Sequence, residues 1–245
     1  MINRFLLAIQ FLTILPVHTK MAREGEYYRT MGWFPAAGLI IGIFTAAVYW
    51  ITSHILPGGM AVLLSLVFQF ALTGGLHLDG LADTLDGCMS GRSLERKLEI
   101  MKDSRLGTHG AAAVMLMFLL KATAYFYVPE SLRITVLMLA PAVGRFALVM
   151  GAWKSVYARK SGLGNLFIGV IGSREAGWAL MTLLLMMGSY PAAYGGLLMA
   201  GVMTFVLKKR ISRILGGMTG DTLGALNEGA EVTFLLGILI IQNWS

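Results

Sequence analysis

Long apolar runs separated by short charged segments dominate this sequence, and they predict helices that cross a membrane. A helix needs roughly 17–25 mainly apolar residues to span the hydrocarbon core. Seven runs approach or reach this length, at Trp33 to Ile55, Gly58 to Leu76, Ala111 to Val128, Ile134 to Trp153, Trp178 to Tyr190, Ala192 to Leu207 and Thr222 to Ile241. We therefore expect an all-α polytopic membrane bundle of about seven spans.

The ends of some runs are less regular. The fifth and sixth runs are short, and the boundary between them falls at Ser189 to Pro191. The run from Phe5 to Val17 is also too short to span comfortably, so it predicts an interfacial or re-entrant helix. Because no small-residue cleavage site follows Pro16, this helix is expected to be retained. In the absence of a polar linker, residues 1–245 are interpreted as one integral-membrane domain.

Composition supports a bilayer as the solvent. Hydrophobic residues make up 56% of the chain and charged residues 13%, and the mean hydropathy is +0.70. The 30 Gly and 16 Met fit this interpretation, because small residues let membrane helices approach closely and Met fills irregular gaps. The Gly-rich spans are also compatible with a homo-oligomer. Cys88 is the single cysteine, which excludes an internal disulfide and a Cys-rich metal site.

The distribution of positive charge predicts an orientation. The net charge is +7, which in a soluble protein would suggest nucleic acid, but here it is explained by the bias of Lys and Arg toward cytoplasmic loops. All but three of the 20 Lys and Arg residues lie on one side if seven spans alternate from a cytoplasmic N-terminus; the exceptions are Lys121, Arg133 and Arg145. We expect no nucleic-acid partner, and an external C-terminus.

Three carboxylates follow the second predicted span at helical spacing. Asp79, Asp83 and Asp86 stand at relative positions 0, 4 and 7, so a helix aligns them on one stripe. Oxygen ligands of this kind suit Mg²⁺ or Mn²⁺, particularly when substrate phosphates complete the shell. The alternative is a solvated helix face, but such faces usually mix Lys with acids, and this stripe has no Lys. We therefore predict a metal site.

The same loop continues into alternating charges before the third predicted span. Lys102 and Arg105 flank Asp103, and the two cations could hold phosphate oxygens. Gly107 and Gly110 would let backbone N–H groups approach an anion near a helix start. The alternative is an ordinary basic loop on the cytoplasmic side. The three carboxylates nearby make a phosphate-binding role the better interpretation.

A third acidic group opens the last predicted span. Asp221, Glu228 and Glu231 stand at relative positions 0, 7 and 10, again on one helical stripe. Carboxylates inside a span are costly and suggest function. The expected topology brings this group to the same face as the Asp79 stripe.

Two basic residues and two histidines also need an explanation. Lys121 and Arg145 fall near the middle of predicted spans and require partners. They would either neutralise a substrate phosphate or form interhelical ion pairs. His77 and His109 flank the charged loop, and each could serve as a base, as a hydrogen-bond partner or in a structural role.

Taken together, these motifs resemble the cobalamin synthase family, whose members are adenosylcobinamide-GDP ribazoletransferases. The resemblance is carried by the strings Phe11 to Pro16, Phe34-Pro35, Gly74 to Gly87, Met101 to Thr108 and Gly217 to Asp221, with Glu228 and Glu231. It covers most of the chain and would place the protein in the cytoplasmic membrane of a prokaryote.

The resemblance implies a reaction in which α-ribazole, or its 5′-phosphate, attacks adenosylcobinamide-GDP and GMP leaves. Phosphoryl chemistry of this type depends on positioning and charge neutralisation. Under this hypothesis Mg²⁺ is held by the metal set Asp79, Asp83, Asp86 and Asp221. The remaining catalytic candidates are His77, Lys102, Asp103, Arg105, Glu228 and Glu231, with Arg145 as a further phosphate ligand.

Other membrane proteins with embedded acids are the alternatives. A CDP-alcohol phosphotransferase or a prenyltransferase would also use acidic metal motifs, but the former expects Ala-Arg where Ala82 is followed by Asp83. A cation-coupled transporter would use the embedded acids to carry ions. The acids gather near one face, which favours chemistry on a cytoplasmic substrate.

Overall fold

A computed structural model of the chain describes residues 2–17, 19, 27–188 and 190–244, and every regular element in these ranges is a helix. The α-helices are α1 (Ile2–Leu12), α2 (Phe34–Ser53), α3 (Gly58–Thr73), α4 (Leu76–Met89), α5 (Leu94–Ile100), α6 (Thr108–Tyr127), α7 (Glu130–Ala152), α8 (Ser173–Met187), α9 (Pro191–Leu215) and α10 (Gly220–Trp244). Two 3₁₀ helices, η1 (Tyr27–Trp33) and η2 (Leu163–Leu166), complete the set. The all-α class is confirmed.

The number of helices that meet the requirements of a full span is lower than the seven predicted. Within the described residues five are long and apolar enough to cross a bilayer, and a sixth span results if α3 and α4 count as one broken crossing. The helix in the fifth predicted run, α8, has 15 residues. At 1.5 Å per residue it falls short of a core about 30 Å thick. The multi-pass bundle holds, with α8 shorter than a full span. The predicted boundary at Ser189 lies outside the described residues.

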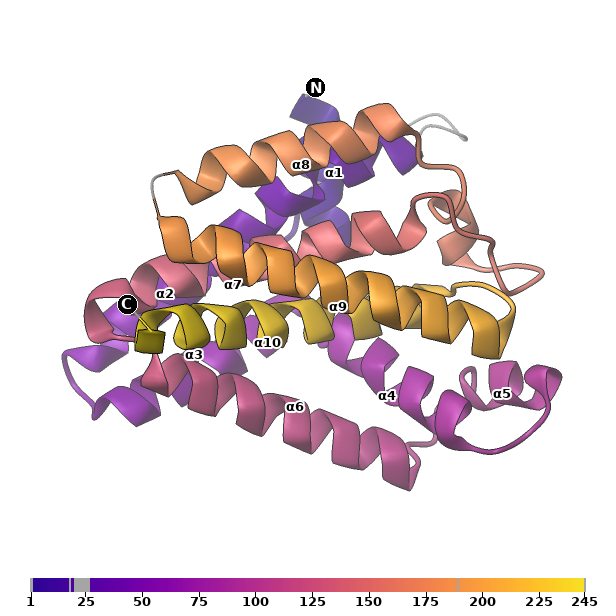
Figure 1. Cartoon of the computed structure of the whole chain (residues 1–245), viewed down its shortest axis with the longest axis horizontal. Coiled ribbons are helices and arrows are strands. Elements are labelled where there is room, and N and C mark those ends of the chain that lie inside the picture. The colour runs from indigo at the N-terminus through magenta and orange to yellow at the C-terminus, as the bar shows by residue number, and fades with distance from the viewer. Residues whose placement is uncertain (1, 18, 20–26, 189, 245) are drawn as a thin grey trace.

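The long helices lie roughly alongside one another (Figure 1). From α6 to α10 the connections between successive helices fall alternately at the two ends of the bundle. One end carries α4, α5, the segment from 153 to 172 and the turn between α9 and α10. We call this the charged end, because most of the Lys and Arg residues of these connections are there.

Helix α7 forms the centre of the bundle and contacts α2, α6, α8, α9 and α10. Its packing against α2 depends on two glycines of α2. A Cβ on Gly38 would stand 2.5 Å from the carbonyl oxygen of Pro141, and one on Gly42 would collide with the backbone of Met138. These glycines allow the two backbones to touch, which is the small-residue packing expected of membrane helices.

Candidate functional site

The candidate site begins at a sharp bend between α3 and α4. The two helices meet at 86°, and the bend is formed by Gly74 and Gly75, whose φ angles are 61° and 69°. Glycine adopts this left-handed conformation without the steric cost that a Cβ imposes. The bend directs α4 away from α3 toward α5, along the charged end (Figure 1). Asp79 and Asp83 are thereby placed outside the apolar centre, with Asp79 exposed and Asp83 half-buried.

A close crossing of α4 and α10 brings the second acidic group to the first. A Cβ on Gly80 would lie 2.8 Å from the carbonyl oxygen of Asp221, and one on Gly224 would lie 3.0 Å from that of His77. A side chain at Gly80 would therefore collide with the backbone of α10, and one at Gly224 would press against the backbone of α4. As a result Asp83 interacts electrostatically with both Asp79 and Asp221. The sequence prediction that the two acidic groups meet at one face is confirmed for Asp79, Asp83 and Asp221.

An arginine that the sequence analysis did not single out joins this cluster. Arg159 donates from Nη2 to Oδ2 of Asp221 over 2.6 Å, and to the carbonyl oxygen of Met101 over 3.1 Å. Its segment is held by a short backbone pairing in which Met218 N–H donates to Val156 and Ala158 N–H donates to Met218. Arg159 could be found only through this long-range pairing, because in the sequence it is one of several basic residues of a charged loop.

Asp86 lies on the same helix but faces a different neighbour. Its carboxylate accepts hydrogen bonds from the backbone N–H groups of Gly107 and Gly110, each over 2.8 Å. Both donors are at the N-terminus of α6, where unpaired N–H groups and the helix dipole favour a negative charge. The two glycines thus receive an anion, as predicted, but the anion is the side chain of Asp86. Both of its oxygens are engaged away from Asp79 and Asp83.

This arrangement predicts a stability role for Asp86. Replacing Asp86 by Ala is expected to lower the free energy of unfolding by about 1–2 kcal/mol, the range for loss of an N-terminal cap. The melting temperature of the detergent-solubilised protein should fall by about 2–8 °C. Asp86→Asn keeps an acceptor and should lose less. An unchanged melting temperature together with an altered Mg²⁺ requirement would instead make Asp86 a metal ligand.

The predicted phosphate-binding loop is exposed. Lys102 and Arg105 point to solvent, and Arg105 forms a salt bridge of 2.5 Å with Asp103. The hydrogen bonds from Arg105 lower the pKa of Asp103 to about 2. A carboxylate with so low a pKa is a poor proton acceptor near neutral pH. The carbonyl oxygen of Met101, which accepts from Arg159, connects this loop to the acidic cluster.

Glu228 and Glu231 lie deeper, in a buried charge network. Lys121 Nζ donates to Glu228 over 2.5 Å and to Glu231 over 2.7 Å, and Arg145 donates to Glu231 over 2.5 Å. All four side chains are at least nine-tenths buried. Lys121 and Arg145 therefore form interhelical ion pairs, one of the two roles expected of them. The two glutamates are separated from the exposed cluster and neutralised by protein charges.

His77 stands between the two groups of charges. It is 6% exposed and borders a small cavity of about 30 Å³ that also touches Lys121, Arg145 and Glu228. It also borders the larger cavity beside Asp79. His109, at the start of α6, is exposed.

That larger cavity has a volume of about 480 Å³ and two kinds of wall. Asp79, Asp221, Arg159 and Tyr157 provide polar groups, and burial raises the pKa of the Tyr157 hydroxyl, so that it remains a donor. The same cavity is also lined by three aromatic rings that pack together. Ring centroids are 5.2 Å apart for Phe11 with Phe167, 5.9 Å for Phe11 with Phe34 and 6.1 Å for Phe34 with Phe167. Charged and planar apolar groups of a ligand could be bound together here.

A second hollow meets the first at Asp79. It is wider, with a volume of about 660 Å³, and shares Phe11, Leu76 and Asp79 with the first. Its remaining lining includes the bend at Gly74 and Gly75. A carboxylate at the junction of two cavities can act on two substrates that approach from different sides.

The carboxylates fit a metal site that a substrate completes. In the described residues no group of three or more His, Cys, Asp or Glu side chains is arranged to hold a metal ion by itself. Mg²⁺, however, is usually bound through one or two carboxylates, with waters and substrate phosphates as the other ligands. Asp79 and Asp83 are suitable donors, because neither forms an ion pair with a described residue. Asp221 is already paired with Arg159.

Comparison with known proteins gives a consistent result along nearly the whole chain. A family model described as cobalamin-5-phosphate synthase matches residues 4–239. A relative from Alkaliphilus metalliredigens is 40% identical, over 98% of this chain and 96% of its own length. Relatives from Thermoanaerobacter pseudethanolicus and Klebsiella pneumoniae are 37% and 39% identical, over 96% and 98% of this chain and 96% and 100% of their own lengths. All three are named adenosylcobinamide-GDP ribazoletransferase. No solved structure matches significantly.

Proposed function

The chain belongs to the cobalamin-5-phosphate synthase family, and on this premise we propose that Asp79, Asp83 and Asp221 form the centre at which it transfers a phosphoryl-linked group. Its reaction is that of an adenosylcobinamide-GDP ribazoletransferase, the activity for which the relatives are named. The observation that carries the assignment to this site is the glycine-mediated crossing of α4 and α10. The crossing collects three carboxylates beside an arginine and an aromatic cavity.

The acceptor substrate in this proposal is α-ribazole or its 5′-phosphate. A ribose hydroxyl attacks the phosphorus on the cobinamide side of the diphosphate, and a new P–O bond forms. The bond to the bridging oxygen breaks, GMP leaves with that oxygen, and the proton of the hydroxyl passes to solvent or the departing phosphate. Catalysis of this type relies on charge neutralisation and on alignment of the two reacting groups.

The side chains divide this work between them. Asp79 and Asp83 would hold Mg²⁺ against the diphosphate, and the ion would neutralise charge on the phosphate oxygens. Arg159 is suited to the departing phosphate, because its guanidinium lines the cavity and is held in place by Asp221. The ring cluster around Phe11 offers a stacking surface for a planar base, such as that of the incoming nucleoside.

The membrane orientation follows from the positive charge. We place the charged end at the cytoplasmic side of a prokaryotic cytoplasmic membrane, where Lys and Arg accumulate and where soluble substrates could reach Asp79. Arg133 is the exception, because it lies near the start of α7, and α7 begins at the end of the bundle opposite the charged end (Figure 1). The transporter alternative is less favoured, because the embedded Glu228 and Glu231 are paired with buried cations.

GMP release by the purified, membrane-embedded protein tests the proposal. Release from adenosylcobinamide-GDP is expected only when both α-ribazole (or its 5′-phosphate) and Mg²⁺ are present. The acceptor supplies the nucleophile, and the ion supplies the positive charge that lets the negative carboxylates bind the negative diphosphate. The four combinations of acceptor and Mg²⁺ form the internal controls. Release that needs the acceptor but continues in excess chelator would remove Mg²⁺ from the proposal. The absence of release from folded protein in all four would remove the whole assignment.

A further inference from the structure

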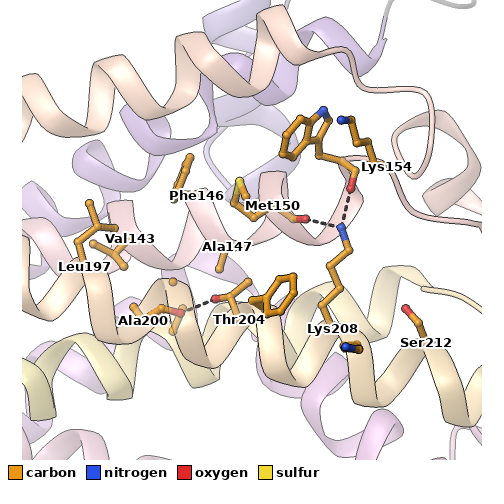
Figure 2. Close-up of a pocket in the computed structure, with 15 residues that line it drawn as sticks. Val143, Phe146, Ala147, Met150, Lys154, Leu197, Ala200, Thr204, Lys208 and Ser212 are labelled. Atoms are coloured by element: carbon orange, nitrogen blue, oxygen red, sulfur yellow. Dashed lines mark hydrogen bonds between the residues drawn. The ribbon is translucent and has the colours of Figure 1, made fainter.

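A groove between α7 and α9 shares no lining residue with the two cavities at Asp79 and has no part in the proposed reaction. It has a volume of about 430 Å³, within the range of small-ligand sites. Figure 2 shows Val143, Ala147 and Met150 of α7 facing Leu197 and Ala200 of α9 across it. The lining is therefore apolar along most of its length.

The groove is accessible from outside the bundle along α9. Phe205, which lines it, is 65% exposed, and the neighbouring Val202 and Val206 are 58% and 55% exposed. Because α9 is apolar and long enough to cross the bilayer, this surface faces lipid. Gly201 leaves further room, since a Cβ added there would meet nothing within 4 Å.

The end of the groove nearest the charged end is polar and positive. Lys154, Lys208, Lys209 and Ser212 line it, and no acidic residue does so among the described ones. Lys208 donates from Nζ to the carbonyl oxygens of Met150 and Trp153, as Figure 2 shows, which neutralises the C-terminus of α7. Its third N–H remains for another acceptor.

Lys154 adds a second positive charge to this end of the groove. It directly follows the C-cap of α7 and has a φ of 52°, the left-handed conformation in which helices commonly end. Its ammonium lies 4.7 Å from the centre of the Trp153 ring, which brings the charge to the mouth of the groove.

From this combination we propose that the groove binds one anionic phospholipid, with an acyl chain between α7 and α9 and its negatively charged headgroup at the end lined by Lys154, Lys208, Lys209 and Ser212. A zwitterionic lipid would satisfy the apolar part but would present a choline or amine to the lysine cluster. Basic residues at a membrane surface attract anionic lipids, and here they stand at the end of a preformed apolar slot. The proposal does not depend on the reaction at Asp79.

Native mass spectrometry of the full chain, titrated in detergent with phosphatidylglycerol or phosphatidylcholine, measures this binding directly. Two test variants address the two halves of the site. Lys154→Ala with Lys209→Ala removes charge from the polar end, and Gly201→Leu places a side chain in the slot at a position where a Cβ has room. Each has a matched control: Arg92→Ala with Arg213→Ala removes two charges from the same end, and Gly177→Leu fills an equally open glycine position on α8.

The expected result is one phosphatidylglycerol bound at least tenfold more tightly than phosphatidylcholine. Both test variants should lose about tenfold in phosphatidylglycerol affinity, and both controls should bind as the wild type does. Equal retention of the two lipids would overturn the proposal. So would an equal loss in the charge control, which would indicate diffuse surface attraction, or unchanged binding in Gly201→Leu, which would place the lipid elsewhere.

Discussion

Asparagine in place of Asp79 is expected to lower the rate of GMP release about 10²- to 10³-fold, the usual cost of losing one preorganised electrostatic group in an active site. The side chain keeps its size, so the fold should be retained. The reason for a large effect is the position of Asp79: it borders both cavities and, in the proposed mechanism, binds the ion that neutralises the diphosphate. Asp83→Asn should act in the same direction.

The measurement is the rate at saturating substrates together with its dependence on Mg²⁺ concentration. If Asp79 and Asp83 hold the ion, the residual activity of each variant should require more Mg²⁺ than the wild type. Glu95→Gln is the matched control, because Glu95 is an exposed carboxylate of the same end, on the short helix α5. Rates within threefold of the wild type for both aspartate variants, in folded protein, would refute the assignment.

The membrane helices could be predicted from the sequence because apolar runs determine where the chain meets lipid. The run from Ile134 to Trp153 corresponds to α7, and that from Ala111 to Val128 to α6. Hydropathy does not determine direction, however. The second run was predicted to continue through Leu76, whereas α3 ends at Thr73 and the chain turns by 86°. Gly74 and Gly75 were visible in the sequence, but glycine in a membrane segment also serves close helix packing, so the pair alone does not predict a bend.

The site was predicted in part for a similar reason. Helical spacing placed Asp79, Asp83 and Asp86 on one stripe of a helix and so predicted that they act together. In the structure the carboxylate of Asp86 is bound elsewhere, by the backbone N–H groups of Gly107 and Gly110. The direction in which each carboxylate points depends on which helix lies opposite, and for Asp86 this is the N-terminus of α6. Arg159 gives no local signal, since its position depends on the pairing of Tyr157 with Met218.

The buried charges show the same limit. A charged side chain inside a membrane span is costly without a partner. The sequence therefore predicted that Lys121 and Arg145 have partners. It could not identify them, because Glu228 and Glu231 are far away along the chain and are brought near only by the packing of α10 against α6 and α7. The stripe of Asp221, Glu228 and Glu231 therefore divides into one residue at the exposed cluster and two in the interior.

This division leads to the second large expected effect, which concerns stability. Replacing Glu231 by Gln is expected to destabilise the protein by about 3–5 kcal/mol, because it leaves buried cations without a full countercharge. Glu231 accepts from Lys121, Arg145, Asn227 and Gln69, and an amide would direct its own N–H groups at some of these donors. The melting temperature should fall by about 6–20 °C. Glu228→Gln should lower the free energy of unfolding by less, because Lys121 still forms an ion pair with Glu231.

A double substitution separates the structural role from a chemical one. Glu231→Leu combined with Arg145→Met removes one negative and one positive charge, and leaves Lys121 paired with Glu228. Apolar replacement of a complete buried pair is often neutral or stabilising, so the double variant should recover most of the stability that Glu231→Gln loses. The exposed carboxylates are unchanged in it, so GMP release should also recover. If Glu231→Gln melts like the wild type yet is inactive, Glu231 takes part in the reaction and the network extends the active site into the membrane.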